Sequence, residues 1–288
     1  MLSTARAAGP RLGDAAGRVV AFLRARWTPQ GGFRGRSDAP DLYYTVFGAE
    51  GLAVLGGGLP ADLAGYLRSF GGGDGLDFVH LVCLARLWAD VPGAGPPPPV
   101  RTSIRGRLGR FRAADGGFSP VEGAARGTAY GAILGLMAYE DIGIDLPDAE
   151  GLARSVESLR APGGGYSNEP GRPAGLTPAT AAAVTVLGRL GRPAEDDAVR
   201  WLLQRGHERG GFAAAPKIPL PDLLSTATAL YALARAGADL GPIRKGCLEF
   251  LDAVWCEEDG GFRAHALDDA ADCEYTWYGL LALGSLGG

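Results

Sequence analysis

Four aspartates in this sequence are each followed, three residues later, by a side chain that forms hydrogen bonds. Residues three apart lie on the same face of a helix, so each pair would place a carboxylate beside a polar group. The pairs are Asp41–Tyr44, Asp77–His80, Asp222–Ser225 and Asp272–Tyr275.

Carboxylates that gather beside an apolar cavity raise one another's pKa, and one that stays protonated can act as a general acid toward an alkene or an alcohol. Alternatively, they can hold a hard cation such as Mg²⁺. We therefore predict Asp222 and Asp272 as general acids or cation ligands, with Asp77–His80 as a second catalytic pair. Substrate contacts are expected from Asp41, Tyr44, Ser225, Tyr275 and Trp277, and also from Glu274, whose direction stays open.

Helix capping accounts for the same aspartates without any chemistry. Asp is favoured at helix N-termini, where its side chain accepts backbone N–H bonds and opposes the helix dipole. The sequence leaves two interpretations open: caps alone, or caps that also line a site.

A repeat of about 40–50 residues positions these pairs. Gly-Gly followed by Phe or Tyr begins at residues 31, 116, 164, 210 and 260, and a degenerate copy lies at 71–75. Ten to fourteen residues after each aromatic comes an apolar helix with a landmark threonine, replaced by Leu81 in the degenerate unit. The inner helices are expected near residues 41–55, 77–90, 124–139, 178–190, 222–236 and 272–286.

The segments before each Gly-Gly are amphipathic, which predicts outer helices. We expect each outer helix to end at the Gly-Gly motif, where a glycine adopts the left-handed conformation common at helix C-termini. The inner segments are apolar on nearly every side, which predicts buried helices. Six outer–inner hairpins predict an all-α fold, a closed α/α toroid of six inner and six outer helices. We expect residues 1–288 to form one such domain.

Composition excludes several classes of protein. The formal charge is −4 and no basic cluster stands out, which argues against a nucleic-acid partner. No segment is long and apolar enough for a transmembrane helix. The four cysteines form no C-x-x-C pair, so we expect reduced thiols and a cytoplasmic location.

The repeat resembles that of the prenyltransferase and squalene-cyclase family, and most closely that of the Rab-type protein geranylgeranyltransferase β subunit. The matching segments are GGFRGRSDAPDLYYT, PLPDLLSTATALYAL and DGGFRAHALDDAADCEYTWYGLLALG, and the likeness covers residues 31–288. The resemblance implies a toroid with an apolar central cavity for an isoprenoid. It also implies a partner subunit, for which the sequence gives no evidence of its own.

The family's zinc and diphosphate motifs are degenerate here. In the family a D-x-C motif and a later His bind zinc; here these positions read Asp222-Leu223-Leu224 and Tyr275. Because Leu cannot ligate a metal, we predict no zinc site, while Mg²⁺ stays an alternative. The family's diphosphate-binding positions include Pro216, Pro219 and Ser225 here, and Lys217 is the nearest basic substitute.

Three functions remain open. The first, which we favour, is a prenyltransferase-like enzyme that acts on an isoprenoid through cavity carboxylates rather than zinc. The second is a terpene or polyene cyclase that starts by protonation. The third is a toroid that binds a lipid or a protein without catalysis. The retained Asp, Tyr and His residues favour the first two.

Overall fold

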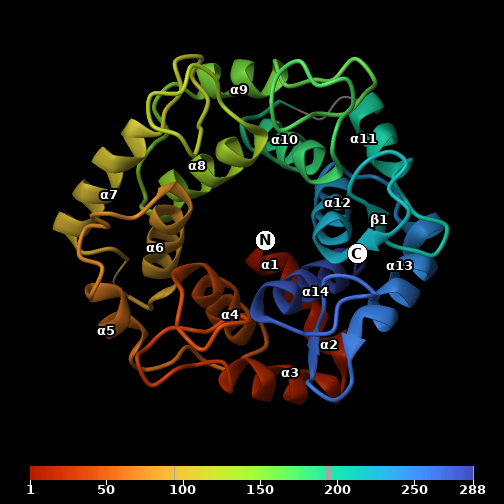
Figure 1. Cartoon of the computed structure of the whole chain (residues 1–288), viewed down its shortest axis with the longest axis horizontal. Helices are drawn as coiled ribbons and strands as arrows, with labels where there is room; N and C mark the ends of the chain where they lie inside the picture. Colours follow the sequence, from red (N-terminus) through yellow and green to blue (C-terminus); the bar gives the residue numbers. More distant parts are fainter. Residues whose placement is uncertain (94, 193–195, 288) are drawn as a thin grey trace.

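Six inner helices form a closed ring in the computed structural model, which describes residues 1–93, 95–192 and 196–287 (Figure 1). Each inner helix packs against the next, and α14 packs against α4 to close the ring. This confirms the predicted α/α toroid. The inner helices are α4 (Leu42–Val54), α6 (Phe78–Asp90), α8 (Ala129–Asp141), α10 (Thr177–Arg189), α12 (Leu223–Arg235) and α14 (Cys273–Ser285).

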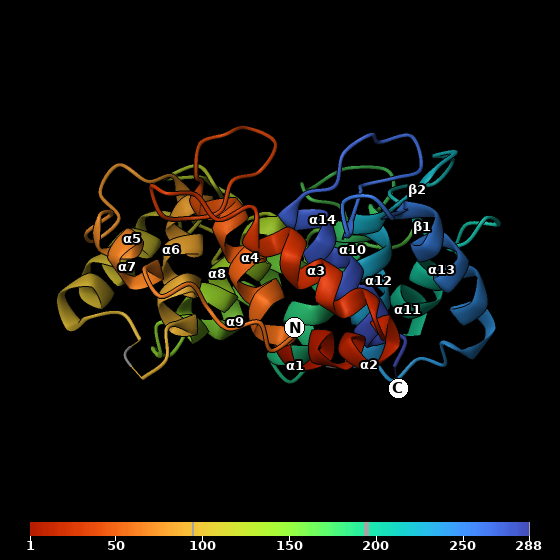
Figure 2. The same cartoon turned by 90° about the horizontal axis from the view of Figure 1, so that it is seen from below.

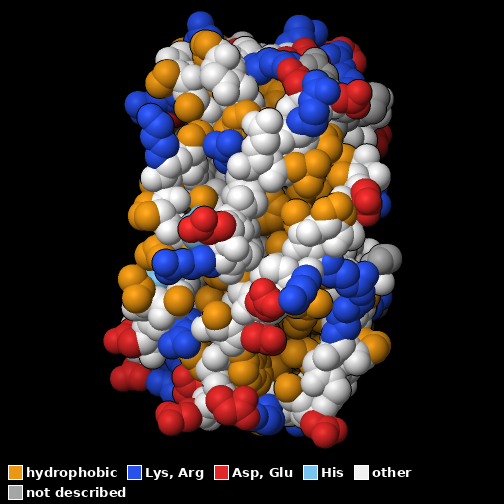
Figure 3. Space-filling view, turned by 90° about the vertical axis from the view of Figure 1, so that its right-hand side faces the viewer, with side chains coloured by type: hydrophobic (Ala, Val, Ile, Leu, Met, Phe, Trp, Pro, Cys, Tyr) orange, Lys and Arg blue, Asp and Glu red, His pale blue; other side chains and the backbone are white. Residues whose placement is uncertain are grey.

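Six outer helices surround this ring (Figure 1). They are α3 (Ala15–Arg24), α5 (Leu63–Arg68), α7 (Pro98–Arg110), α9 (Ala149–Glu157), α11 (Asp196–Leu203) and α13 (Gly241–Val254). Seen from the side of α11 and α13, acidic and basic side chains are spread over the surface with apolar ones between them (Figure 3). That distribution fits helices with one apolar face turned toward the core.

The Gly-Gly motifs do not end the outer helices, contrary to the prediction. α13 ends at Val254, and Gly260 lies in the turn of a hairpin whose arms, β3 (Trp255–Cys256) and β4 (Gly261–Phe262), pair in antiparallel register. A Cβ on Gly210 would lie 1.8 Å from the carbonyl oxygen of Gly246 in the next outer helix, α13. The φ of Gly210 is also +79°, a conformation that residues with a Cβ rarely adopt. Glycine is therefore required here both by the backbone conformation and by the close packing.

In at least three units the landmark threonine ties the turn that carries the Gly-Gly motif to the inner helix that follows it. The hydroxyl of Thr226 accepts a hydrogen bond from the Phe212 N–H at 2.9 Å and donates one to the Asp222 carbonyl at 2.7 Å. Thr45 and Thr180 do the same in their units, and all three are fully buried. The threonine at this position is therefore a structural clamp.

The third inner helix begins at residue 129, not near 124 as predicted. Thr128 is the N-cap of α8, and its hydroxyl accepts the Gly131 N–H at 2.8 Å. It thus stands where the other units have Asp41 or Asp222, and not at the clamp position. Thr128 lies ten residues after Phe118 and so has the spacing predicted for the landmark threonine, but it is one helical turn before the clamp position, which is why the predicted start of this helix is too early.

Three short N-terminal helices lie on the opposite side of the ring from the loops that lead into α4 and α14 (Figure 2). They are α1 (Leu2–Ala5), η1 (Arg6–Ala8) and α2 (Gly9–Leu12). α1 packs on α14 and α4, beneath the centre of the ring (Figure 1).

A second short sheet pairs β1 (Phe212–Ala213) with β2 (Pro221–Asp222). Within the described ranges, every helix is too short or too polar to span a bilayer.

Candidate active site

The ring encloses a cavity of about 330 Å³ whose wall follows a simple rule. When positions are counted from the first residue of each inner helix, the wall consists of positions two, five, six and nine, together with Met1. This spacing is that of one face of an α-helix. The cavity therefore has four layers, from a mouth at position two to a floor at position nine.

The mouth layer holds a carboxylate bonded to a tyrosine. It consists of Tyr43, Val79, Tyr130, Pro178, Leu224 and Glu274. The Tyr43 hydroxyl donates to Glu274 Oε1 at 2.6 Å. Burial raises the pKa of Glu274, and this outweighs the hydrogen bond from Tyr43, which acts in the opposite direction. Glu274 is therefore the mouth carboxyl with an increased tendency to stay protonated.

The two middle layers are mostly apolar and rich in aromatic rings on one side. Position five contributes Val46, Val82, Ile133, Ala181 and Trp277, and position six contributes Phe47, Cys83, Leu134, Ala182, Thr228 and Tyr278. The rings of Phe47 and Tyr278 lie 5.7 Å apart, below Glu274. Aromatic faces in such a pocket stabilise a positive charge.

The floor layer is polar although it is buried. Glu50, Arg86, Thr185 and Tyr231 lie there with Met137. The Arg86 Nε donates to Glu50 Oε1, and Arg86 Nη1 lies 3.7 Å from Asp141 Oδ2. The side chain of Glu50 is 2% exposed.

The four predicted aspartates lie at the rim, at the N-caps of their helices, and none of them lines the cavity. Asp222 accepts both the N–H and the hydroxyl of Ser225, at 2.8 and 2.7 Å. Asp272 accepts the Tyr275 N–H at 2.9 Å. Burial raises the pKa of both carboxyls against these hydrogen bonds.

His80 joins two of the rim aspartates. Its Nδ1 lies 2.9 Å from Asp77 Oδ1, and its Nε2 lies 3.3 Å from Asp41 Oδ2. Burial alone lowers the pKa of His80, but the hydrogen bond to Asp77 and the charges of Asp77 and Asp41 outweigh it, so the pKa is raised. The contact ties α4 to α6 at the rim.

Arg36 joins the loops at the other side of the rim. Its guanidinium donates to both Asp268 oxygens, at 3.0 and 2.6 Å, and to Asp272 Oδ2 at 3.1 Å. The hydrogen bond from Arg36 lowers the pKa of Asp268 to about 2. Arg36 is therefore engaged by two carboxylates.

Of the other predicted contacts, Glu274 and Trp277 face the cavity, and Tyr44, Ser225, Tyr275 and Lys217 do not line it. Lys217 is exposed in the loop between β1 and β2, with a φ of +69°. The Tyr44 ring lies where a Cβ on Gly35 would be, so it packs against the loop. The structure thus brings Glu274 into one cavity with Tyr43, and with three residues that the sequence did not point to as site residues, namely Tyr130, Glu50 and Arg86.

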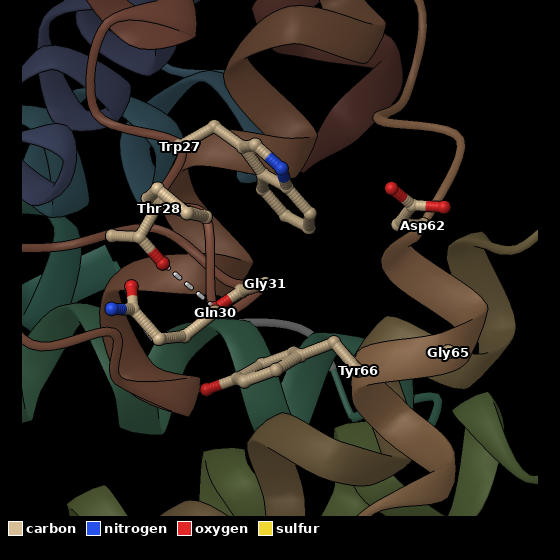
Figure 4. Close-up of a pocket in the computed structure, with 8 residues that line it drawn as sticks. Trp27, Thr28, Gln30, Gly31, Asp62, Gly65 and Tyr66 are labelled. Atoms are coloured by element: carbon tan, nitrogen blue, oxygen red, sulfur yellow. Dashed lines mark hydrogen bonds between the residues drawn. The ribbon is translucent and has the colours of Figure 1, made fainter.

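A second pocket, of about 580 Å³, opens on the outside of the ring between α5 and the turn at residues 27–31. Figure 4 shows Trp27, Tyr66 and the Asp62 carboxylate around it. The central cavity is the better candidate because it is surrounded by the ring and combines a buried carboxyl with an apolar wall.

The family model of the prenyltransferase alpha-alpha toroid domain matches residues 14–71, 100–213 and 179–286, most of the chain. The chain belongs to this family. No curated protein matches it.

Solved structures of other toroids share the fold at low sequence identity. A type II terpene cyclase, MstE from Scytonema, is 15% identical with a TM-score of 0.64, over 100% of this chain and 98% of its own. Candida albicans protein geranylgeranyltransferase-I complexed with GGPP is 17% identical with a TM-score of 0.54, over 93% and 75%. A polysaccharide lyase is 12% identical with a TM-score of 0.54, over 98% and 97%. Because these structures carry different chemistries, the likeness establishes the fold alone.

The zinc site that the family resemblance implies does not fit the residues present. Both oxygens of Asp222 are occupied by Ser225, Leu224 has no ligand atom, and burial raises the pKa of Tyr275 to about 12. A zinc ligand at that position would have to give up its proton easily. In the described part of the chain, no group of three or more His, Cys, Asp or Glu side chains could hold a metal ion.

Proposed function

We propose that the chain is an enzyme that binds a neutral isoprenoid in the central cavity and protonates it, with Glu274 as the general acid. The observation that carries the proposal is the Glu274–Tyr43 pair, which places a half-buried carboxyl at the mouth of an aromatic, apolar cavity. The proposal keeps the chemistry expected from the sequence, that of a cavity carboxylate, and assigns it to Glu274 instead of Asp272, two positions earlier.

The proposed reaction consumes no net proton, because Glu274 first donates a proton and later receives one back. Glu274 gives its proton to one carbon of an alkene, whose π electron pair forms the new C–H bond and leaves a tertiary cation on the other carbon. The rings of Trp277, Tyr278 and Phe47 stabilise that cation. Loss of a proton to the Glu274 carboxylate then restores the acid, so that the product is an isomer of the substrate.

The charge of the rim favours a neutral substrate over a diphosphate. The side chains of Asp41 and Asp77 are 39% and 65% exposed at the mouth, and Arg36 is already engaged by Asp268 and Asp272. Prenyl transfer from a diphosphate is the second candidate, supported by the structural likeness to the transferase complexed with GGPP.

The cysteines support the predicted location. All four are free thiols, which fits a reducing compartment, and we extend the proposal to a cytoplasmic enzyme.

The test is product analysis in heavy water. We expect the wild-type chain, offered geraniol, farnesol and geranylgeranyl diphosphate, to convert one of the alcohols with uptake of one deuterium. Glu274→Gln should lower the rate about 10²- to 10⁴-fold, the usual contribution of a general acid. Asp272→Asn is the matched control, two residues away, and should keep its rate.

Three results would contradict the proposal. Conversion without deuterium uptake would exclude protonation, and full activity of Glu274→Gln would exclude this acid. Conversion of the diphosphate alone would move prenyl transfer to first place.

A further inference from the structure

The floor of the cavity, defined here as Glu50, Arg86, Thr185 and Tyr231, is polar where the rest of the wall suggests a hydrocarbon ligand. These four residues occupy position nine of α4, α6, α10 and α12. Glu50 and Arg86 are paired with each other, and both line the cavity. A wholly apolar ligand that reached the floor would leave their remaining donors and acceptors without partners in a dry site, which is costly.

The charged groups around the floor indicate which polar group of a ligand would bind there. Arg86 lines it together with the amino group of Met1, which donates to the Tyr231 hydroxyl at 3.4 Å, and Glu50 and Asp141 both lie beside the Arg86 guanidinium. Asp141 Oδ2 is buried and accepts no hydrogen bond from any residue in the described ranges. Because Glu50 and Asp141 already lie against the Arg86 guanidinium, an additional carboxylate would have to compete with them for it. A hydroxyl donates to Glu50 and accepts from Arg86 without adding charge.

The depth of the cavity sets the length of the ligand. Positions two and nine are seven residues apart, so at about 1.5 Å per residue the mouth and floor layers lie about 10 Å apart along the helix axes. An extended chain of about two isoprene units spans that distance.

We propose that the floor binds the hydroxyl of an isoprenoid alcohol, so that the substrate enters hydroxyl first and presents its terminal alkene to Glu274. The inference rests on the proposed function and adds the substrate's functional group, its orientation and its approximate length. Glu50 and Arg86 are then binding residues that determine specificity at the end of the cavity opposite the acid.

The experiment is calorimetric titration with three matched probes: geraniol, the hydrocarbon 2,6-dimethylocta-2,6-diene, and geranic acid. The wild-type chain should bind geraniol about 10- to 100-fold more tightly than the hydrocarbon, the range expected for hydrogen bonds to charged groups. In Glu50→Leu/Arg86→Met, which replaces both partners by apolar residues, the two should bind equally. Glu169→Gln, in an exposed ion pair, is the control and should keep the preference.

A milder variant keeps the test decisive if the double replacement does not fold. Thr185→Val/Tyr231→Phe removes two hydroxyls with little change of shape and should reduce the preference several-fold. Glu274→Gln, at the mouth, should retain the full preference for geraniol although its reaction rate is lowered.

The outcomes separate this inference from the proposed function. If none of the probes binds, the isoprenoid cavity itself is refuted. If the hydrocarbon binds as tightly as geraniol to the wild-type chain, the hydroxyl does not lie on the floor and protonation by Glu274 still stands. If only Glu274→Gln removes the preference, the hydroxyl lies at the mouth, and both this orientation and the protonation of the terminal alkene by Glu274 are refuted. Tighter binding of geranic acid would replace the alcohol by a carboxylate.

Discussion

Asp272 and Glu274 are two residues apart in the same helical turn, and the fold uses them in opposite ways. Asp272 lies at the rim, where its oxygens accept the Tyr275 N–H and the Arg36 guanidinium. Glu274 lies in the wall, where its partner is the Tyr43 hydroxyl and its surroundings are apolar. Burial raises the pKa of both carboxyls.

The difference shows that helix position, rather than residue type or pKa, decides the role. A carboxylate at the N-cap has backbone N–H groups within reach, so its hydrogen bonds stabilise the fold. A carboxylate at position two points into the ring and keeps an oxygen for a ligand. The rim and the wall should therefore respond differently to substitution.

The largest expected difference is in stability. Asp272→Ala removes a buried cap and a charged partner of Arg36, so we expect a loss of about 2–3 kcal/mol in the free energy of unfolding. Glu274→Gln should change it by less than about 1 kcal/mol. Urea denaturation measures both. Equal losses would mean that Glu274 is as structural as Asp272.

Two threonines of α12 provide a second comparison between structure and cavity wall, with an expected effect on stability of intermediate size. Thr226 clamps the Phe212 N–H, whereas Thr228 lines the cavity and bonds a carbonyl of its own helix. Thr226→Val should cost about 1–3 kcal/mol because it leaves a buried N–H without a partner, and Thr228→Val should cost less than about 1 kcal/mol. Hydrogen exchange of the Phe212 amide provides the second readout. An unchanged exchange rate in Thr226→Val would refute the clamp.

The smallest expected effect is the pH dependence of the His80 contacts. The pKa of His80 is raised in the folded state, so its contribution is complete below the unfolded value of about 6.5 and disappears as pH rises through the folded pKa. Burial alone would raise the pKa of Asp77, but hydrogen bonds from His80 lower it, so this contribution disappears as pH falls through its folded pKa.

Both groups are substantially exposed, so the total should stay below about 1 kcal/mol. Thermal unfolding of the wild-type chain and His80→Gln, followed from pH 4 to 9, should differ most between about pH 4 and 6.5. A difference that grew above that range would have the wrong sign for these contacts.

The repeat predicted the ring, but the face of each helix that lines the cavity could not be predicted. The inner helices are apolar on nearly every side, so hydrophobic periodicity marks no face. The threonine landmark directed attention to the N-cap and to position three, where Asp222 and Ser225 bond each other. Only the packing of each helix between its two neighbours turns position two, and thus Glu274, inward.

Other parts of the site depend on contacts between units. The contact of His80 with Asp41 joins residues of two helices, and Arg36 reaches Asp268 across the seam between the first and last units. No local pattern encodes these distances. A signal for the floor was nevertheless present, since Glu50 and Arg86 interrupt apolar helices at equivalent positions.

The closure of the ring has a consequence for how the chain folds. The first outer helix, α3, packs against Gly260 and Gly261 of the last hairpin, through Arg18 and Phe22. During synthesis, α3 can pack on α4 early, but its contacts with the last hairpin form only after the last unit has been made. Until then, both open ends of the growing arc expose apolar helix faces, which are liable to aggregate. We infer that docking of α14 between α12 and α4 is a late, long-range step, and that it sets the overall folding rate.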